Sequence, residues 1–451
     1  MAVPALRRGL RTLGTLLITL SAISPASSVF IIAPGVLAGA GSGAFLSFLA
    51  AGVVGVFMAF VYAELSSAFP LSGGEYAIVA RTLGRLPGFL VLGMMMITQL
   101  LIVAVIALGV GTYLSVLLPG LPGPTVAAAT CVLAAVVAVF DIKLNAWVTG
   151  IFLAVELLAL GVVSALGLLH PARAFGELVS HPVTSTGPAT IGAIAIATSV
   201  AIFAYNGYGS AVYFGEETQN ASRGIARAIL LALGITVLAE LVPVTAVLLG
   251  APDLGALFGA ENMMSYFIST QGGSTLDTVI SLAIALAIVN AVLAIVLISS
   301  RLVFSSGRDR AWPAAVNRAL SAVHPRFGTP WIATLGTGLI AALLCYVDQQ
   351  LLVVVTSTSI VAVYLALCLS AIRGRRTGAT AHAQYRMPLF PVAPVLALAA
   401  LAFVVYQNAL DEKVGRPSLI VTVGMVLLAL LYYVLVLRRR GGWQLVEPEQ
   451  T

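Results

Sequence analysis

The sequence predicts an all-α polytopic membrane protein, on three observations. Of its 451 residues, 60% are hydrophobic and only 9% are charged, whereas soluble domains carry about a quarter charged residues. Apolar runs recur along the chain, each long enough to cross a hydrocarbon core of about 30 Å. Strictly alternating ten-residue segments, typical of outer-membrane barrels, are not what recurs. Since lipid offers no partner to an unpaired backbone group, the apolar runs must be helices.

Twelve transmembrane helices are predicted from these runs, with both termini in the cytoplasm. The spans cover residues 12–38, 44–69, 89–117, 123–140, 145–169, 188–217, 224–249, 276–305, 331–347, 351–372, 392–409 and 417–437. In this orientation all but three of the 23 Lys and Arg residues are cytoplasmic, the exceptions being Arg173, Lys413 and Arg416. The positive-inside rule therefore favours it. Topology explains the net charge of +6 without a nucleic-acid partner, and the Arg- and Ala-rich usage suggests a bacterial inner membrane.

Two predicted spans contain sequences that interrupt a helix at mid-membrane. The first reads Ser-Ala-Ile-Ser-Pro-Ala-Ser-Ser over residues 21–28, where Pro25 lacks a backbone donor and serines compete for backbone hydrogen bonds. The sixth reads Phe-Ala-Tyr-Asn-Gly-Tyr-Gly-Ser over residues 203–210, with two flexible glycines. Paired interruptions in two repeats indicate a transport site, because half-helix ends present free N–H and C=O groups. Two packing kinks are the alternative.

The interval between the breaks also indicates an internal repeat. Spans two and seven are separated by a similar interval, as are spans three and eight, so one run of five spans maps onto the next. An odd number of spans gives the two copies opposite membrane orientations. The predicted organisation is a cytoplasmic N-terminus (1–11), a first repeat (12–169), an inverted repeat (188–372), two further helices (392–437) and a cytoplasmic tail (438–451).

Several loop sequences resemble those of the amino acid–polyamine–organocation (APC) superfamily of permeases. The motifs that carry the resemblance are Tyr62-Ala63-Glu64-Leu65, Phe69-Pro70, Gly73-Gly74-Glu75-Tyr76, residues 203–208, Glu216-Glu217, Asn220-Ala221-Ser222-Arg223, Ser299-Ser300-Arg301, Gly307-Arg308-Asp309, Trp312-Pro313, residues 324–330 and Arg386-Met387-Pro388-Leu389. The resemblance extends from residue 12 to about residue 440. It implies a LeuT-like fold of two inverted five-helix repeats plus two peripheral C-terminal helices, with helices 1 and 6 broken, and transport by alternating access.

The resemblance also implies a substrate site at the two breaks. The substrate carboxylate would meet the backbone of Ala26, Ser27 and Ser28, and its amino group the carbonyls of Ile23, Ser24, Phe203, Ala204 and Asn206. Phe203 would be an aromatic gate beside the Gly207 break, and Tyr205 and Tyr208 would line the pocket or pack between helices. Many relatives have a Gly-Ser-Gly spacing at the first break. Here residues 25–28 read Pro-Ala-Ser-Ser, which predicts a smaller or differently shaped ligand.

Two carboxyl groups, Glu156 and Glu240, lie well inside predicted spans. A charge at mid-bilayer costs roughly 2.5–3.5 kcal/mol, so each should be protonated or partnered. Glu156 stands where many relatives place a lysine that substitutes for a bound sodium ion. It would carry a coupling proton, neutralise a cationic substrate, or complete a sodium site with Ser299 and Ser300. We favour the proton, with a structural hydrogen-bonded role as a further alternative. Glu240, nearer the outer end of its span, is expected to have a structural or rim role.

The remaining chemistry of the sequence points away from an enzyme. The four histidines fall in loops, and no Asp lies well inside a span, so an intramembrane catalytic site or metal site is not expected. The three cysteines are interpreted as packing residues without a disulfide. The loop pairs Glu216-Glu217 and Arg308-Asp309 are interpreted as cytoplasmic gate or loop contacts, or as solvated charges. No P-loop, cofactor motif or nucleic-acid site is present.

We therefore expect a secondary active transporter that moves a small amino acid by alternating access. We expect transport to be coupled to a proton, with sodium as the less favoured coupling ion. A mono- or polyamine permease or exchanger of the same fold is the alternative, because amines can bind carboxylates and aromatic rings. A sensor or a channel derived from a transporter is a minor alternative. The substrate and the lipid bilayer are the only partners expected.

Overall fold

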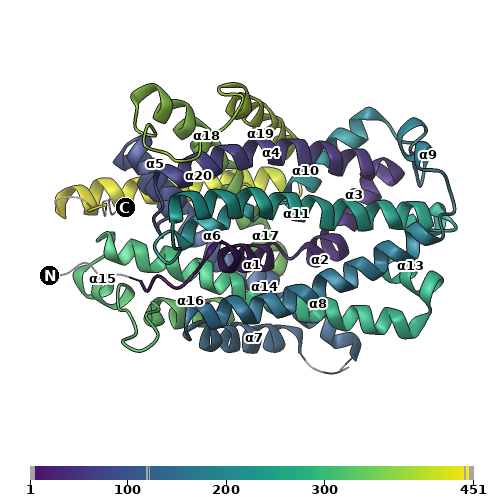
Figure 1. Cartoon of the computed structure of the whole chain (residues 1–451), viewed down its shortest axis with the longest axis horizontal. Coiled ribbons are helices and arrows are strands. Elements are labelled where there is room, and N and C mark those ends of the chain that lie inside the picture. Colours follow the sequence, from purple (N-terminus) through teal and green to yellow (C-terminus); the bar gives the residue numbers. More distant parts are fainter. Residues whose placement is uncertain (1–5, 118–119, 121, 441–442, 446–451) are drawn as a thin grey trace.

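The computed structural model describes residues 6–117, 120, 122–440 and 443–445. Its long helices run alongside one another in one bundle, with the two ends of the chain at the same end of that bundle (Figure 1). Among the described residues, nine helices are long and apolar enough to cross a membrane, and two further apolar helices are shorter. The prediction of an all-α polytopic membrane protein is therefore confirmed.

The bundle is built from the longer helices and their broken or bent continuations. These are α1 (Thr12–Ile23), α2 (Pro25–Ser27), η1 (Ser28–Ile32), α3 (Ala33–Ala40), α4 (Ala44–Ala68), α6 (Arg85–Leu117), α7 (Gly123–Ala138), α8 (Ile142–Leu169), α10 (Ile191–Ala204), η3 (Tyr208–Phe214), α11 (Ala221–Gly250), α14 (Ser274–Arg308), α16 (Trp331–Leu344), α17 (Gln349–Ser357), α18 (Ser359–Thr377), α19 (Val392–Leu410), α20 (Gly415–Tyr432), η4 (Tyr433–Leu437) and η5 (Arg438–Arg440).

Shorter elements connect them. These are η2 (Gly41–Gly43), α5 (Glu75–Thr82), α9 (Phe175–Ser180), α12 (Leu254–Gly259), α13 (Met263–Gly272) and α15 (Ala314–Leu320), with the antiparallel strands β1 (Val183–Thr184) and β2 (Gly187–Pro188). The strands pair Val183 with Pro188 and Thr184 with Gly187. Residues 75–82, expected to be a loop, form α5.

The helices follow the predicted spans, with differences that have local causes. The two shorter apolar helices, α7 and α16, correspond to spans four and nine, and the 14-residue α16 reaches only about 21 Å. Span ten divides into α17 and α18 at Thr358. The backbone N–H of Thr358 donates to the Ser418 hydroxyl at 3.0 Å, and side-chain acceptors of this kind compete with the helix ladder.

Helices at matching positions of the two predicted repeats pack against each other. Helix α4 packs on α11, α6 packs on α14, and α7 packs on α16. Buried Cys131 of α7 and buried Cys345, directly after α16, are free thiols with their sulfur atoms 3.8 Å apart. The core of the bundle is therefore formed largely by contacts between segments far apart in the sequence.

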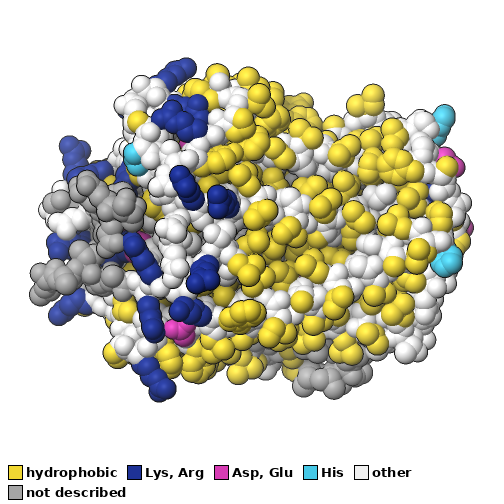
Figure 2. Space-filling view, in the orientation of Figure 1, with side chains coloured by type: hydrophobic (Ala, Val, Ile, Leu, Met, Phe, Trp, Pro, Cys, Tyr) yellow, Lys and Arg dark blue, Asp and Glu magenta, His cyan; other side chains and the backbone are white. Residues whose placement is uncertain are grey.

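Charge is distributed unevenly over the surface. Lys and Arg side chains gather over the end of the bundle that holds the two ends of the chain, and hydrophobic side chains cover the middle of the visible face (Figure 2). We call the end of the bundle that carries these Lys and Arg side chains the basic end. Arg173 belongs to the opposite end, where its guanidinium donates to the carbonyls of Leu248 and Ala251. This separation agrees with the charge asymmetry read from the sequence.

The crossing of α8 and α11 depends on two glycines in direct contact. A Cβ added at Gly167 would lie 1.9 Å from the Ala246 carbonyl oxygen, and one added at Gly250 would lie 2.4 Å from the Gly167 Cα. Small residues let membrane helices approach closely enough for backbone-to-backbone packing. No side chain fits at either position without separating the helices.

We predict that Gly167→Leu lowers the thermal stability of the protein in detergent micelles. Forcing extra atoms into a packed interface costs typically about 1–3 kcal/mol, and here the clash is with backbone. The matched control is Gly161→Leu on the same helix, because an added Cβ at Gly161 meets nothing within 4 Å. Equal melting temperatures for the two variants would show that the crossing is looser than described.

Candidate functional site

The first predicted break is a real interruption of the helix. Helix α1 ends at Ile23 because Ser24 adopts a left-handed conformation with φ of 50°. Pro25 follows and has no N–H to continue the ladder. The second half starts at Pro25 and continues as α2, η1 and α3 to Ala40. The backbone N–H groups at the start of this half have no carbonyl of the first half to bind.

The second break lies after α10 and touches the first. Helix α10 ends at Ala204, Gly207 has φ of 121°, and the chain resumes as the 3-10 helix η3. A Cβ added at Gly207 would lie 2.8 Å from Ile23 Cγ1. The Ser28 hydroxyl donates to the Ala204 carbonyl at 2.9 Å. The two interruptions, about 180 residues apart in sequence, therefore meet in space.

Glu156 of α8 binds directly to the first break. Its Oε1 accepts a hydrogen bond from the backbone N–H of Ala26 at 2.8 Å and lies 3.0 Å from the Ser24 hydroxyl oxygen, which donates to it. The Ser24 and Ser27 hydroxyl oxygens are 2.7 Å apart. Glu156 is fully buried, and its Oε2 has no hydrogen-bond partner. A carboxylate of the protein itself thus occupies a backbone donor that we expected a substrate to use.

Glu240 of α11 approaches the same break from another side. Its side chain lies beside Ser28 and interacts electrostatically with Glu156 and with Tyr205. Glu240 is fully buried, and neither carboxyl oxygen has a hydrogen-bond partner, because Ser28 donates to Ala204 instead. A rim position therefore does not hold for Glu240. Its position beside the first break was not predicted from the sequence, although a carboxyl inside a span was the available signal.

The aromatic residues of the second break do not all point inward. Phe203, the predicted gate, is 44% exposed. Tyr205 is buried edge-on to Phe48, with ring centroids 5.6 Å apart, and its hydroxyl has no hydrogen-bond partner. Tyr208 is buried edge-on to Tyr62, with ring centroids 6.1 Å apart.

A small pocket lies beside the second break, between α4, α10, α18 and α19. Tyr205, Tyr208, Tyr364, Met58 and Leu401 are among the residues that line it. The Tyr364 hydroxyl donates to the side-chain oxygen of Asn206. Asn206 is therefore held from α18, and the pocket offers aromatic rings with a few hydroxyl groups.

Ser299 and Ser300 are not brought to Glu156. The Ser299 hydroxyl donates to the Gln99 carbonyl at 3.2 Å, and the Ser300 hydroxyl donates to the Leu297 carbonyl at 2.9 Å. Helices α8 and α14 meet where Asn290 donates to the Thr149 carbonyl at 3.1 Å. From the level of this contact, Glu156 lies about 10 Å along α8 toward the end opposite the basic end. Ser299 lies about 13 Å along α14 toward the basic end. The structure gives no support to a sodium site made by these three residues.

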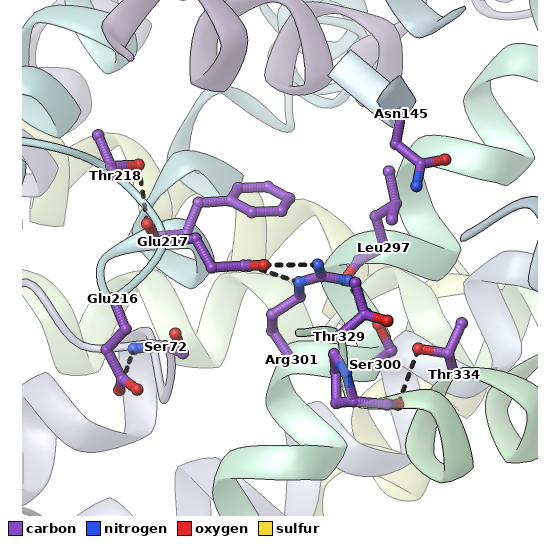
Figure 3. Close-up of polar contacts among 12 residues, drawn as sticks. Ser72, Asn145, Glu216, Glu217, Thr218, Leu297, Ser300, Arg301, Thr329 and Thr334 are labelled. Atoms are coloured by element: carbon purple, nitrogen blue, oxygen red, sulfur yellow. Dashed lines mark hydrogen bonds and ion pairs between the residues drawn. The ribbon is translucent and has the colours of Figure 1, made fainter. Parts of the chain in front are cut away.

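A buried ion pair lies at the basic end. The Arg301 guanidinium of α14 donates to both carboxylate oxygens of Glu217 at 2.7 and 2.8 Å, and both side chains are fully buried (Figure 3). The Glu217 carbonyl accepts from the N–H groups of Gly9 and Leu10 at 3.0 and 2.9 Å. The Thr15 and Thr218 hydroxyl oxygens are 2.8 Å apart. The start of α1, the segment after η3 and α14 are therefore joined.

Further charges at this end are also paired rather than solvated. Arg308 binds the Glu216 carboxylate, which also accepts from the Ser72 N–H at 3.0 Å (Figure 3). The Tyr76 hydroxyl donates to Asp309 at 2.8 Å. Burial raises the pKa of Asp309 to about 6, against the opposing effect of Arg308. The alternative of free loop charges is wrong for these residues.

An ion pair also joins α4 to α18. Arg375 donates to both oxygens of Glu64, at 2.7 and 2.6 Å, and the Met387 N–H donates to the same carboxylate at 2.8 Å. Glu64 belongs to the Tyr-Ala-Glu-Leu motif, whose pattern therefore marks a structural contact. Over the described ranges, no group of three or more His, Cys, Asp or Glu residues is arranged to hold a metal ion.

Comparison with known proteins places this architecture in a family. The sequence matches the amino acid permease family over residues 10–435. An uncharacterized transporter of Mycobacterium tuberculosis is 33% identical over 75% of this chain and 74% of its own length. The branched-chain amino acid permease BcaP of Bacillus subtilis is 25% identical over 88% of this chain and 87% of its own. The methylthioribose transporter of the same organism is 25% identical over 84% of each chain. The chain therefore belongs to the amino acid permeases of the APC superfamily.

Proposed function

We propose that this protein is a secondary active transporter that moves a small amino acid by alternating access, with Glu156 as the proton-carrying group. The observation that carries the proposal is the meeting of the two helix breaks, with Glu156 bound to the Ser24 hydroxyl and the Ala26 N–H. Broken helices that face each other at mid-membrane form the substrate site of many secondary transporters. The name of the BcaP relative, a branched-chain amino acid permease, agrees with this substrate class.

The proposed architecture has twelve spans in two inverted repeats, residues 12–169 and 188–372, followed by two peripheral helices in residues 392–437. The packing of α4 on α11, α6 on α14 and α7 on α16 supports it, because a symmetry axis between inverted repeats brings matching helices together. The two ends of the chain lie at the same end of the bundle (Figure 1), in agreement with an even number of membrane crossings. The basic surface at that side favours a cytoplasmic location. We propose the bacterial inner membrane.

In the proposed site, the substrate carboxylate binds the backbone around Ala26, Ser27 and Ser28, and the amino group binds carbonyls at both breaks. The candidate carbonyls are those of Ile23, Ser24, Phe203, Ala204 and Asn206. Ser28 already donates to the Ala204 carbonyl, and Gly207 contacts Ile23. The limited space between the breaks favours a small ligand, with Tyr205 and Tyr208 at its edge.

Alternating access requires the basic end to open. The Glu217–Arg301 pair holds the start of α1, the segment after η3 and α14 together. The Glu216–Arg308 pair lies close by. We therefore interpret these pairs as the closed gate of this conformation, which must separate before a substrate reaches the cytoplasm.

An amine substrate is the second candidate, and the Glu240 carboxyl favours it. Both Glu240 oxygens lack a hydrogen-bond partner although the group is fully buried next to Glu156. A buried carboxylate without a partner is costly and attracts a cationic group or a proton. A mono- or polyamine would supply that cation without a carboxylate to place at Ala26.

Uptake by the purified protein in proteoliposomes tests the function. We expect one or more neutral amino acids from a radiolabelled panel to accumulate, and an inward proton gradient to raise the accumulation. The panel includes mono- and polyamines, so preferential uptake of these would select the second candidate. Specific binding without flux would identify a sensor, and flux unaffected by any gradient would identify a channel.

Replacement Glu156→Gln tests the coupling. Gln keeps an oxygen for the Ser24 and Ala26 donors but cannot take up a proton. We expect the variant to remain folded and to lose the effect of the proton gradient on accumulation. An unchanged pH dependence and substrate range would remove Glu156 from the mechanism. Glu177→Gln is the control, because Glu177 is an exposed carboxylate far from the breaks.

Replacement Glu217→Gln tests the gate. Removing one partner of a buried ion pair costs about 3–5 kcal/mol, because the other charge stays unpaired. This weakens the closed state, in which Arg301 and Glu217 are both fully buried. We expect faster labelling by a water-soluble maleimide of a cysteine introduced by Thr15→Cys, at a position that is buried in the closed end.

The native cysteines are replaced by alanine in all the labelled proteins. The control is Glu412→Gln, since the Glu412–Arg416 pair is exposed and exposed pairs contribute about 0–1 kcal/mol. Labelling at the control rate in Glu217→Gln would contradict a gate at this ion pair.

A further inference from the structure

The first break offers its backbone donor to a carboxylate, and the chain supplies that carboxylate itself. Glu156 Oε1 lies 2.8 Å from the Ala26 nitrogen and accepts from Ser24 as well. The proposed substrate, an amino acid, carries the same chemical group. Two carboxylate groups cannot accept the same N–H hydrogen in the same place, so the substrate carboxylate and Glu156 exclude each other at this donor.

We infer that Glu156 is a built-in competitor for the carboxylate of the substrate: an amino acid that binds at Ala26 displaces Glu156, and the displaced carboxylate takes up one proton. The inference rests on the proposed function and specifies how its site recognises its substrate. The proton comes from water and leaves the protein again when the substrate departs and Glu156 returns to its donors. Apart from this proton transfer between solvent water and the Glu156 carboxylate, no covalent bond is made or broken.

The surroundings of Glu156 explain why displacement requires a proton. In the structure described, Glu156 is fully buried and only Oε1 has donors, while Oε2 has none. Moving the group away from Ser24 and Ala26 removes both donors. A buried carboxylate without donors or a counter-ion is far more costly than a neutral carboxylic acid, so protonation accompanies the displacement.

The groups that face Glu156 strengthen this effect. From α11 comes Glu240, a second fully buried carboxyl, which disfavours a negative charge nearby. The first break contributes only hydroxyl groups and backbone. Of the other helices packed on α8, α14 brings the amide of Asn290, α7 has Cys131 as its titratable residue, and α13 has Tyr266. Arg301 and Asp277 lie toward opposite ends of α14. None of these supplies a cation at the level of Glu156.

Amino acids and amines are expected to differ in proton uptake at Glu156. An amine has no carboxylate and leaves Glu156 on its donors, so its binding takes up no proton at this residue. The probes are L-alanine and L-leucine, each paired with the amine that lacks its carboxylate, ethylamine and 3-methylbutylamine. Their affinities are measured by calorimetry on the purified full-length protein from pH 5 to pH 8.

We expect the affinity for the amino acids to rise about tenfold for each unit of falling pH while Glu156 is ionised in the empty site, as uptake of one proton per ligand requires. The affinity for the amines should not rise in that range. In Glu156→Gln this slope, the change of amino acid affinity with pH, should vanish. Ser24→Ala keeps the carboxyl but removes one of its donors, so it should bind amino acids more tightly than wild type at high pH and keep a slope.

Three results overturn the inference. These are amino acid binding that is independent of pH, an unchanged slope in Glu156→Gln, and equal slopes for the amino acids and their amines. Uptake of an amino acid with a pH-independent affinity would leave the proposed function standing and remove only the competition. Failure of all four probes to bind, with no amino acid transported from the full panel, would remove both. The control variant Glu177→Gln should show the same pH dependence of amino acid affinity as the wild type.

Discussion

The centre of the protein depends on one contact, the hydrogen bonds between Glu156 and the broken first helix. A helix that stops at Ser24 leaves backbone N–H groups without carbonyl partners in a region where lipid offers none. Glu156 of α8 satisfies the Ala26 N–H and the Ser24 hydroxyl together, so another helix holds the break in addition to the Ser28 N–H bond to the Ser24 carbonyl. The interruption can then face the second break, where Ser28 reaches the Ala204 carbonyl. The two breaks can meet inside the bundle because the chain supplies a polar group of its own to satisfy the first one.

Charge is used differently at the centre and at the basic end. At the basic end the buried carboxylates of Glu217 and Glu64 each have an arginine with two hydrogen bonds. At the centre Glu156 and Glu240 have no basic partner among the described residues and lie within electrostatic reach of each other. Paired charges suit contacts that hold segments together, whereas an unpaired carboxyl responds to a proton or a ligand. Glu217 and Glu64 therefore differ from Glu156 and Glu240 in having an arginine partner.

Local sequence signals predicted those features that have local causes. Pro25 and the serines predicted the first break, and Gly207 the second, because backbone chemistry at these positions forbids a regular helix. The positions of Lys and Arg predicted the charged end. What the sequence did not predict depends on the rotation and sliding of one helix against another. The serines at 299 and 300 lie on a helix that does contact α8, but at the wrong level. Phe203 is exposed although its neighbours Tyr205 and Tyr208 are buried. Glu240 looked peripheral because its distance from the first helix is set only by the α11 packing.

The departure of this chain from its family at the first break acquires a physical reason from the same contact. Glycines, which the family resemblance leads us to expect there, would leave bare backbone for a ligand, whereas this chain has Pro25, Ala26 and serine hydroxyls, with Glu156 on α8. A lysine would add a positive charge beside the carbonyl end of α1, but it could not accept the Ala26 N–H hydrogen. A glutamate accepts it directly. The serines at the break and the glutamate on α8 therefore belong together, since a break that presents serine hydroxyls and the Ala26 N–H is complementary to a carboxylate. Under the proposed competition, this carboxylate, tethered to a neighbouring helix, satisfies the break without a ligand, and substrate binding exchanges one carboxylate for another.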